Sequence, residues 1–146
     1  MPDQLGQALP APLFKSVALI GLGLIGSSIA RAAKHKNLAG RIVAIDNNPD
    51  VAARVRELAL ADSVETDAAL GVRDCDLVIL CAPVGANVAI AQQIAASLTP
   101  GVILSDVGSV KTAVVRDVSP YLPEGAHFIP AHPVAGTEQS GPDAGF

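Results

Sequence analysis

One histidine near the end of the sequence has the surroundings of a catalytic group. His132 begins the stretch HPVAGTEQSG, in which a stiff proline is followed by an adaptable glycine-rich loop. Imidazole, with an unperturbed pKa of about 6.5, can accept the proton of an alcohol while hydride leaves the adjacent carbon. A histidine at the end of a strand is equally often structural, but this loop favours the catalytic interpretation. His35 and His127 lack such surroundings, and we interpret them as surface or structural residues.

Ser109 is the second candidate for this chemistry. It lies in SDVGSVK (105–111), which continues from an apolar strand, and its hydroxyl can bind the same alcohol or orient the imidazole. Serine is also a common residue at the N-cap of a helix, and we expect a helix to begin at Ser109 and to end near Ser119. The two roles are compatible, so Ser109 is a candidate for both.

A glycine motif, GLGLIG (21–26), fits the dinucleotide-binding pattern G-x-G-x-x-G between a strand and a helix. In that context Gly21 permits the tight turn, Gly23 lets the backbone approach a pyrophosphate, and Gly26 lets the helix pack close to the strand. The helix N-terminus then favours phosphate groups. A purely structural turn is the alternative. The predicted cofactor-binding residues are Gly21, Gly23, Leu24, Ile25, Gly26, Asp46, Ala82 and Pro83.

Asp46 supports the nucleotide interpretation and selects the nucleotide. It ends a predicted strand 25 residues after Gly21, close to the separation of about 20 expected for the acid that binds ribose hydroxyls. Its carboxylate would repel a 2′-phosphate, and the NNP that follows holds no arginine, so NAD is preferred over NADP. A turn or cap aspartate is the alternative. CAPV (81–84) ends the fourth strand close to the expected cofactor, although Pro83 can simply terminate that strand.

These candidate residues lie at the ends of predicted strands. Short β-branched runs alternate with helical stretches, which predicts right-handed βαβ units in a doubly wound parallel sheet, the Rossmann fold, with strand order 3-2-1-4-5-6. Ligands of this fold bind outside the carboxyl ends of the strands, where the strand order reverses. The expected strands are 15–21, 41–46, 63–65, 76–83, 102–107 and 127–132, and the expected helices are 24–36, 49–60, 67–71, 85–98 and 109–119.

Helical periodicity predicts which residues of the first two helices face the sheet. In the first helix we expect Ile25, Ile29, Ala32 and Ala33 to face inward and Arg31 and Lys34 to face outward. In the second we expect Val51, Val55 and Leu58 to face inward.

The composition favours one apolar domain. Of the 146 residues, 50% are hydrophobic and only 16% are charged, which indicates fully buried parallel strands together with apolar surface that a partner or further domain covers. We expect a flexible tail over 1–13 and the folded domain over 14–146. Cys75 and Cys81 fit reduced thiols, and their spacing gives no metal-binding pattern.

The charge and hydropathy patterns exclude other classes. A net charge of −4 without a run of basic residues argues against a nucleic-acid partner. No apolar stretch approaches the roughly 20 residues of a membrane helix, and the first twelve residues lack the features of a secretory signal. We therefore expect a cytoplasmic protein.

Three stretches together resemble the N-terminal domain of prephenate dehydrogenase and its arogenate and cyclohexadienyl relatives. These are VALIGLGLIGSSIARAAK (17–34), DVGSVK (106–111) and HPVAGTEQSG (132–141), and the resemblance extends from about residue 15 to the last residue. It implies NAD-dependent oxidation of prephenate or arogenate with loss of CO₂, giving 4-hydroxyphenylpyruvate or tyrosine. His132 then matches the catalytic histidine and Ser109 the serine beside it. Lys111, Thr137, Glu138 and Ser140 match positions at the substrate mouth.

The resemblance also implies a second, all-helical domain that forms a homodimer and supplies an arginine for a substrate carboxylate. We therefore expect the 146 residues to be a fragment that binds NAD and turns over poorly or not at all. Two alternatives remain open. One is another Rossmann dehydrogenase, such as a β-hydroxyacid dehydrogenase or an imine reductase. The other is a non-catalytic NAD-sensing module, which would need the glycine motif and Asp46 but neither His132 nor Ser109.

Overall fold

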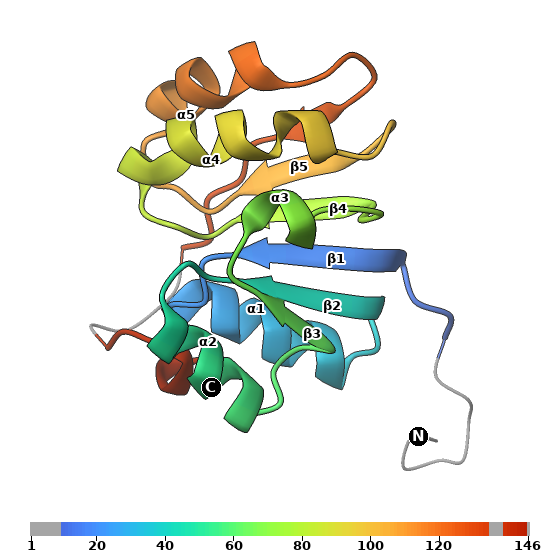
Figure 1. The fold of residues 1–146 in the computed structure, drawn as a ribbon, viewed down its shortest axis with the longest axis vertical. Coiled ribbons are helices and arrows are strands. Elements are labelled where there is room, and N and C mark those ends of the chain that lie inside the picture. Colours follow the sequence, from blue (N-terminus) through green and yellow to red (C-terminus); the bar gives the residue numbers. More distant parts are fainter. Residues whose placement is uncertain (1–9, 135–138, 146) are drawn as a thin grey trace.

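The computed structural model describes residues 10–134 and 139–145, and the strands in these ranges form one six-stranded sheet (Figure 1). The strand order is β3-β2-β1-β4-β5-β6, and all pairs are parallel. This confirms the predicted doubly wound topology. The strands are β1 (Phe14–Ile20), β2 (Ala39–Ile45), β3 (Ser63–Glu65), β4 (Leu77–Leu80), β5 (Ile103–Asp106) and β6 (His127–Ile129).

Helices connect successive strands and cover both faces of the sheet. Figure 1 shows α1 and α2 beside β2 and β3, with α4 and α5 in the other half of the molecule beside β4 and β5. None of the helices in the described residues is both long and apolar enough to cross a bilayer. The helices are α1 (Leu24–His35), α2 (Pro49–Glu57), α3 (Ala68–Gly71), α4 (Asn87–Ile94) and α5 (Lys111–Val118).

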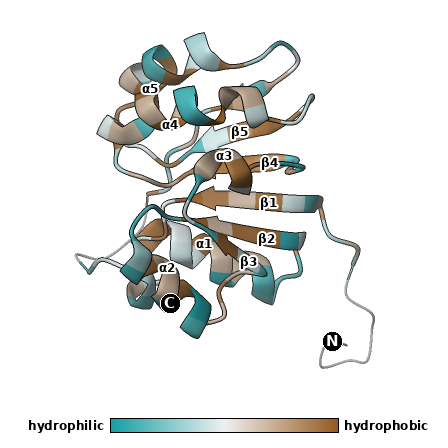
Figure 2. Ribbon diagram, in the orientation of Figure 1, coloured by the Kyte–Doolittle hydropathy of each residue, from teal (hydrophilic) through white to brown (hydrophobic). Residues whose placement is uncertain are grey.

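Strand β1 is apolar along most of its length because it has a hydrophobic cluster on each face. Val17 and Leu19 pack with residues of α1 and α2, whereas Ala18 and Ile20 pack with residues of α3, α4 and α5. Successive side chains of a strand point to opposite faces, so a strand that is covered on both sides favours an apolar side chain at every covered position. Figure 2 shows this as brown central strands between more hydrophilic helix surfaces.

Small residues bring α1 close to the sheet, and the expected inward face of this helix was partly wrong. The buried residues are Gly26, Ser27, Ala30 and Ala33, whereas Ala32 is exposed. Ile29 packs against the core at its edge, and Ile25 is half-buried. The bulky isoleucines lie beside the contact because the glycine, serine and alanines allow a closer approach. In α2, Val55 is buried, and Val51 and Leu58 pack against the same cluster as predicted.

Several elements are shorter than predicted, which places the candidate residues in loops. Strand β6 ends at Ile129, where Pro130 has no N–H to continue the ladder, so His132 lies three residues beyond the strand. Strand β4 ends at Leu80, so residues 81–83, which were predicted to belong to this strand, lie in the loop that follows it. The single helix expected over 85–98 consists of α4 between two 3-10 turns, Val84–Ala86 and Ala95–Ser97.

The last described residues pack against α1 and α2, a contact that the sequence did not indicate (Figure 1). The 3-10 turn Pro142–Ala144 places Asp143 against Arg54, with Nη2–Oδ1 and Nε–Oδ2 distances of 2.6 and 3.0 Å. Gly145 is buried so closely on α1 that an added Cβ would lie 2.4 Å from the Ser27 hydroxyl. Residues 142–145 therefore lie on the face of the sheet that α1 and α2 cover.

We predict that Gly26→Ala destabilises the fold severely. An added Cβ would lie 2.0 Å from the Gly21 carbonyl oxygen, a backbone atom that cannot move aside cheaply. The expected loss in free energy of unfolding is about 3 kcal/mol or more, measured by urea denaturation. Gly85→Ala is the matched control, because an added Cβ there meets nothing within 4 Å. Equal stability of the Gly26→Ala variant and the wild type would contradict the close approach.

Candidate functional site

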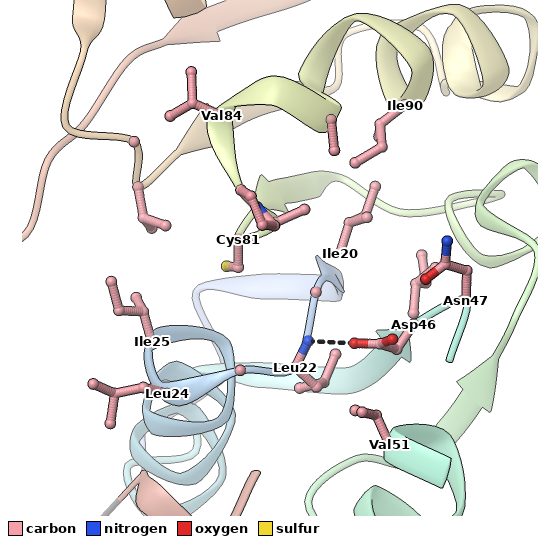
Figure 3. Close-up of a pocket in the computed structure, with 18 of the residues that line it drawn as sticks. Ile20, Leu22, Leu24, Ile25, Asp46, Asn47, Val51, Cys81, Val84 and Ile90 are labelled. Atoms are coloured by element: carbon pink, nitrogen blue, oxygen red, sulfur yellow. Dashed lines mark hydrogen bonds between the residues drawn. The ribbon is translucent and has the colours of Figure 1, made fainter. Parts of the chain in front are cut away.

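A cleft of about 1000 Å³ lies across the carboxyl ends of the central strands, where the strand order reverses between β1 and β4. Figure 3 shows its lining from the β1–α1 loop, from the end of β2 and from the segment after β4. The predicted residues that line it are Gly21, Gly23, Leu24, Ile25, Asp46, Ala82, Pro83, Ser109, His132 and Ser140. Gly26 and Lys111 do not line it, and Thr137 and Glu138 lie outside the described residues.

The three glycines of the motif lie in three different environments. Gly21 has a φ of +97°, and an added Cβ would lie 2.7 Å from the Ala82 nitrogen, so β1 and the segment after β4 come together there. Gly26 supports the α1 contact described above. Gly23 has open space where its side chain would be, with nothing within 4 Å. Open space at the start of a helix, on the wall of a cleft, fits the close approach of a ligand.

The first turn of α1 presents N–H groups at this open space. Gly23 occupies the N-cap position without a side chain to bind those donors. Ser27 and Ser28 turn their hydroxyls back, and they donate to the Leu24 carbonyl oxygen at 3.1 and 2.7 Å. The first N–H groups of a helix have no acceptor within the helix and carry its positive dipole end. This turn is therefore suited to a phosphate group.

Asp46 ties the end of β2 to the glycine motif. Its Oδ2 accepts a hydrogen bond from the Leu22 N–H at 3.0 Å (Figure 3), and its Oδ1 accepts one from the Asn48 N–H at 3.0 Å. Asn48, not Asp46, caps α2 by accepting from the Asp50 N–H at 2.9 Å. A carboxylate offers about four acceptor positions, so these two bonds leave capacity for hydroxyl donors in the cleft.

The Asp46 end of the cleft also contains residues that the sequence did not single out. Figure 3 shows Val51 and Ile90 on opposite sides of Asp46. Thr66 and Gln93 supply polar groups to the same lining, and the Gln93 amide donates to Asp67 Oδ1 at 3.1 Å. They come from α2, α4 and the β3–α3 loop. Only the tertiary fold brings these segments together, so no local motif indicates them.

Ser109 and His132 line the same cleft from the loops after β5 and β6. Both are exposed. The prediction that Ser109 caps a helix was wrong, because α5 begins at Lys111 and Val110 occupies the N-cap position without a side-chain bond. The hydroxyl of Ser109 thus belongs to the loop and not to the helix end, which suits a role toward a ligand.

A buried carboxylate that the sequence analysis did not assign connects these two loops. Asp106, at the end of β5, is 0% exposed and accepts from Gly108 N–H at 2.8 Å and Ala131 N–H at 3.1 Å. Lys111 donates to Asp106 Oδ2 and to the Ala131 carbonyl oxygen. Asp106, Gly108, Lys111 and Ala131 are called the Asp106 network below. The role of Lys111 at a substrate mouth remains a prediction.

The two cysteines are free thiols, and neither is activated. Burial, with a smaller contribution from the Asp106 charge, raises the pKa of Cys81 to about 12. Burial also raises the pKa of Cys75, whose Sγ lies 3.4 Å from the Ser16 hydroxyl. Cys81 lines the cleft beside the glycine motif, with its Cβ 3.3 Å from the position of an added Cβ on Gly26. A thiol with a raised pKa is protonated near pH 7, which disfavours Cys81 as a nucleophile.

Comparison with known proteins identifies relatives of the chain. Residues 29–146 match the family model described as prephenate dehydrogenase, nucleotide-binding domain. A cyclohexadienyl dehydrogenase of Zymomonas mobilis is 47% identical over 135 residues, which are 92% of this chain and 45% of the relative. The chain thus spans about half the length of that relative.

Two solved structures are similar in fold. A prephenate dehydrogenase of Aquifex aeolicus, in complex with hydroxyphenyl propionate and NAD⁺, has a TM-score of 0.79 at 30% identity, covering 88% of this chain and 45% of that one. An arogenate dehydrogenase of Synechocystis has a TM-score of 0.79 at 28% identity, covering 88% and 44%.

We predict that Cys81 resists alkylation in the folded chain. At pH 8 the thiol is protonated because its pKa is raised to about 12, and it is partly buried. Iodoacetamide should therefore modify neither cysteine before unfolding and both after addition of urea, as measured by mass spectrometry. The thiol ionises at a lower pH in the unfolded chain than in the folded chain. The contribution of Cys81 to the free energy of unfolding is therefore constant below about pH 9 and falls as the pH rises toward 12. Rapid modification of Cys81 in the native chain would contradict its burial.

Proposed function

The chain belongs to the prephenate dehydrogenase family through its nucleotide-binding domain, and we propose that its cleft binds NAD for the oxidative decarboxylation of prephenate or arogenate. One observation carries the proposal. A single cleft is lined by the glycine motif, by Asp46 and, from other loops, by Ser109 and His132. A dinucleotide site and a proton acceptor in one cleft are what a dehydrogenase requires.

The residues present fit NAD. Gly23 leaves open space beside the first turn of α1, which suits the pyrophosphate. Asp46 has acceptor positions left for ribose hydroxyls, and its charge disfavours a 2′-phosphate. Among the described residues, no lysine or arginine lines the cleft to balance the negative charge of that phosphate. These features support NAD in preference to NADP. When bound, NAD supplies the hydride acceptor.

His132 and Ser109 have complementary roles in the proposed reaction. The imidazole of His132 holds the proton of the ring C4 hydroxyl while hydride leaves C4. Ser109 orients that hydroxyl or the imidazole through its own hydroxyl. When CO₂ leaves, the electron pair of the broken C1–carboxylate bond enters the ring and makes it aromatic. The proton held by His132 then returns to the phenolic oxygen. The aromatic product drives the step forward, so the chain contributes mainly position and a proton acceptor.

The cleft does not by itself account for binding of the substrate carboxylates. Prephenate carries two carboxylates, and buried carboxylates normally pair with cationic groups. The described lining contains no lysine or arginine. We therefore propose that groups from outside the described residues bind these carboxylates, in agreement with the arginine and second domain that the family resemblance implies. The choice between prephenate and arogenate depends on those groups.

Nucleotide titration tests the first half of the proposal. In calorimetry, the wild-type chain should bind NAD at least about tenfold more tightly than NADP. Asp46→Ala should weaken NAD binding and reduce this preference, because the carboxylate both contacts ribose and repels a 2′-phosphate. Gly23→Ala should weaken binding of both nucleotides, because its methyl group occupies the space left for the pyrophosphate.

Stability measurements separate lost binding from lost folding in these variants. Gly23→Ala should cost about 1 kcal/mol or less in free energy of unfolding, because its added Cβ meets no protein atom. Wild-type affinity for NAD in a folded Gly23→Ala variant would contradict the proposed pyrophosphate position.

Turnover tests the second half of the proposal in a chimera that joins residues 1–146 to the unmatched part of the Zymomonas mobilis relative. We predict NADH formation that depends on prephenate or arogenate. His132→Asn should lower kcat by about 10²- to 10⁴-fold, the usual contribution of a general acid–base, and leave NAD affinity within about twofold. His35→Asn, an exposed position on α1, is the matched control. Unchanged kcat in His132→Asn would contradict the assignment, and NAD binding without any turnover would favour the NAD-sensing module.

A further inference from the structure

We propose that Asp106 and Lys111 are positioning residues that fix the spacing of the Ser109 and His132 loops. The inference deepens the proposed function, on which it rests for the roles of those two residues. Neither Asp106 nor Lys111 lines the cleft. They act through the backbone of Gly108 and Ala131, which precede the cleft residues Ser109 and His132.

One carboxylate binds the immediate neighbour of each candidate catalytic residue. Asp106 Oδ2 accepts from the N–H of Gly108, which precedes Ser109, at 2.8 Å. Its Oδ1 accepts from the N–H of Ala131, which precedes His132, at 3.1 Å. The two oxygens are held at a fixed separation within one carboxylate group. The relative position of the two loops is therefore set by a single buried side chain.

Lys111 closes the connection from the first turn of α5. Its ammonium donates to Asp106 Oδ2 and to the carbonyl oxygen of Ala131. Ala131 is thus bound through both its N–H and its C=O. The pairing of β5 with β6 ends at Ser105 and Ile129, so the Asp106 network holds Ala131 where the sheet does not.

The loop that Asp106 holds has little room to relax. An added Cβ on Gly108 would lie 2.9 Å from Val84 Cγ2, 3.0 Å from Asp106 Oδ2 and 3.0 Å from Val114 Cγ2. Both carboxylate oxygens act as acceptors, Oδ2 for the Gly108 N–H and the Lys111 ammonium and Oδ1 for the Ala131 N–H. An asparagine keeps only one acceptor oxygen, so in either orientation of its amide the nitrogen would face at least one of these donors.

A positioning role differs from a general stabilising role in what each does to ligand binding. The Asp46 end of the cleft is lined by the start of α1, the end of β2, α2, α4 and the β3–α3 loop, whereas the hydrogen bonds of the Asp106 network join Gly108, Lys111 and Ala131. The other end is built by 107–109 and 132–133. Disruption of the network should therefore weaken binding of NAD, which reaches both ends, and spare AMP, which needs only the first.

The experiment compares Asp106→Asn, Lys111→Met and Lys111→Arg in the 146-residue chain. The matched control is Asp117→Asn, which breaks the exposed Arg116–Asp117 pair on the same helix. NAD and AMP affinities are measured by calorimetry, and exchange of the Gly108 and Ala131 amide protons by NMR.

We expect Asp106→Asn and Lys111→Met to weaken NAD binding about fivefold or more while AMP binding stays within about twofold. Exchange of the Ala131 amide should accelerate about tenfold or more in both variants, and exchange of the Gly108 amide should accelerate in Asp106→Asn. Asp106→Asn weakens the acceptor of these amides, and Lys111→Met removes the ammonium that holds this acceptor in place. Lys111→Arg, which keeps charge and donors, should retain most of the NAD affinity. Asp117→Asn should change nothing.

Equal losses of NAD and AMP affinity, or unchanged Ala131 exchange in Asp106→Asn, would overturn the proposal. If Asp106→Asn fails to fold, Lys111→Met decides, since the Lys111 side chain is 32% exposed and its removal leaves both backbone bonds to Asp106 possible. If the wild type binds neither nucleotide, the proposed function fails. Amide exchange then still tests the network: lost protection of Ala131 supports it, and retained protection overturns it.

Discussion

The close approach of α1 to the junction of β1 and β4 is the contact on which the site depends. Gly21 allows the chain to pass beside Ala82 with a positive φ, and Gly26 allows α1 to lie directly on the Gly21 carbonyl. A side chain at Gly26 would push the helix away from the Gly21 carbonyl, and one at Gly21 would push the end of β1 away from the segment after β4. The contact points the N-terminus of α1 at the place where the strand order reverses. The cleft, the turn proposed to bind phosphate and the access of Asp46 to the glycine motif all follow from this placement.

Two carboxylates have the same physical role at opposite ends of the cleft. Asp46 accepts from the Leu22 N–H and joins the end of β2 to the glycine motif, whereas Asp106 accepts from the Ala131 N–H and joins the end of β5 to the loop after β6. Bonds between a charged acceptor and backbone N–H groups are stronger than neutral ones. They hold loops that have left the hydrogen-bond ladder of the sheet. The difference is exposure: Asp46 lines the cleft and is available to a ligand, whereas Asp106 is buried beneath it.

Sequence periodicity and motif spacing predicted the parts of the molecule that follow from local patterns. Apolar runs indicated the six strands, and their alternation with helices predicted the strand order, because both depend on the chain's local periodicity and connection lengths. Gly21, Gly23 and Asp46, which line the cleft, were predicted for the same reason, since a motif and its expected spacing lie within one βαβ unit. Ser109 and His132 were paired because parallel strands bring their carboxyl ends to one edge.

The remaining features depend on contacts between distant segments. Nothing local distinguishes Asp106 from Asp67, which caps a helix, or shows that Lys111 reaches Ala131 instead of the cleft. Val51, Ile90 and Gln93 meet in the lining only after the sheet has formed. Residues 142–145 pack on α1 and α2, and there Asp143 forms an ion pair with Arg54, 89 positions away in the sequence. In α1 the periodicity was visible, but the bulky residues lie beside the contact face because small residues pack closer.

The central claim is that one cleft holds a dinucleotide from the glycine motif to His132. NMR titration of the ¹⁵N-labelled wild-type chain with NAD tests it most directly, since each backbone amide reports its own environment. We predict saturable shifts of Gly23 and Asp46 at one end and of Ser109 and His132 at the other, with the same apparent Kd. Shifts confined to the first pair, or two different Kd values, would contradict a single extended site. No shifts at all would contradict NAD binding by this chain.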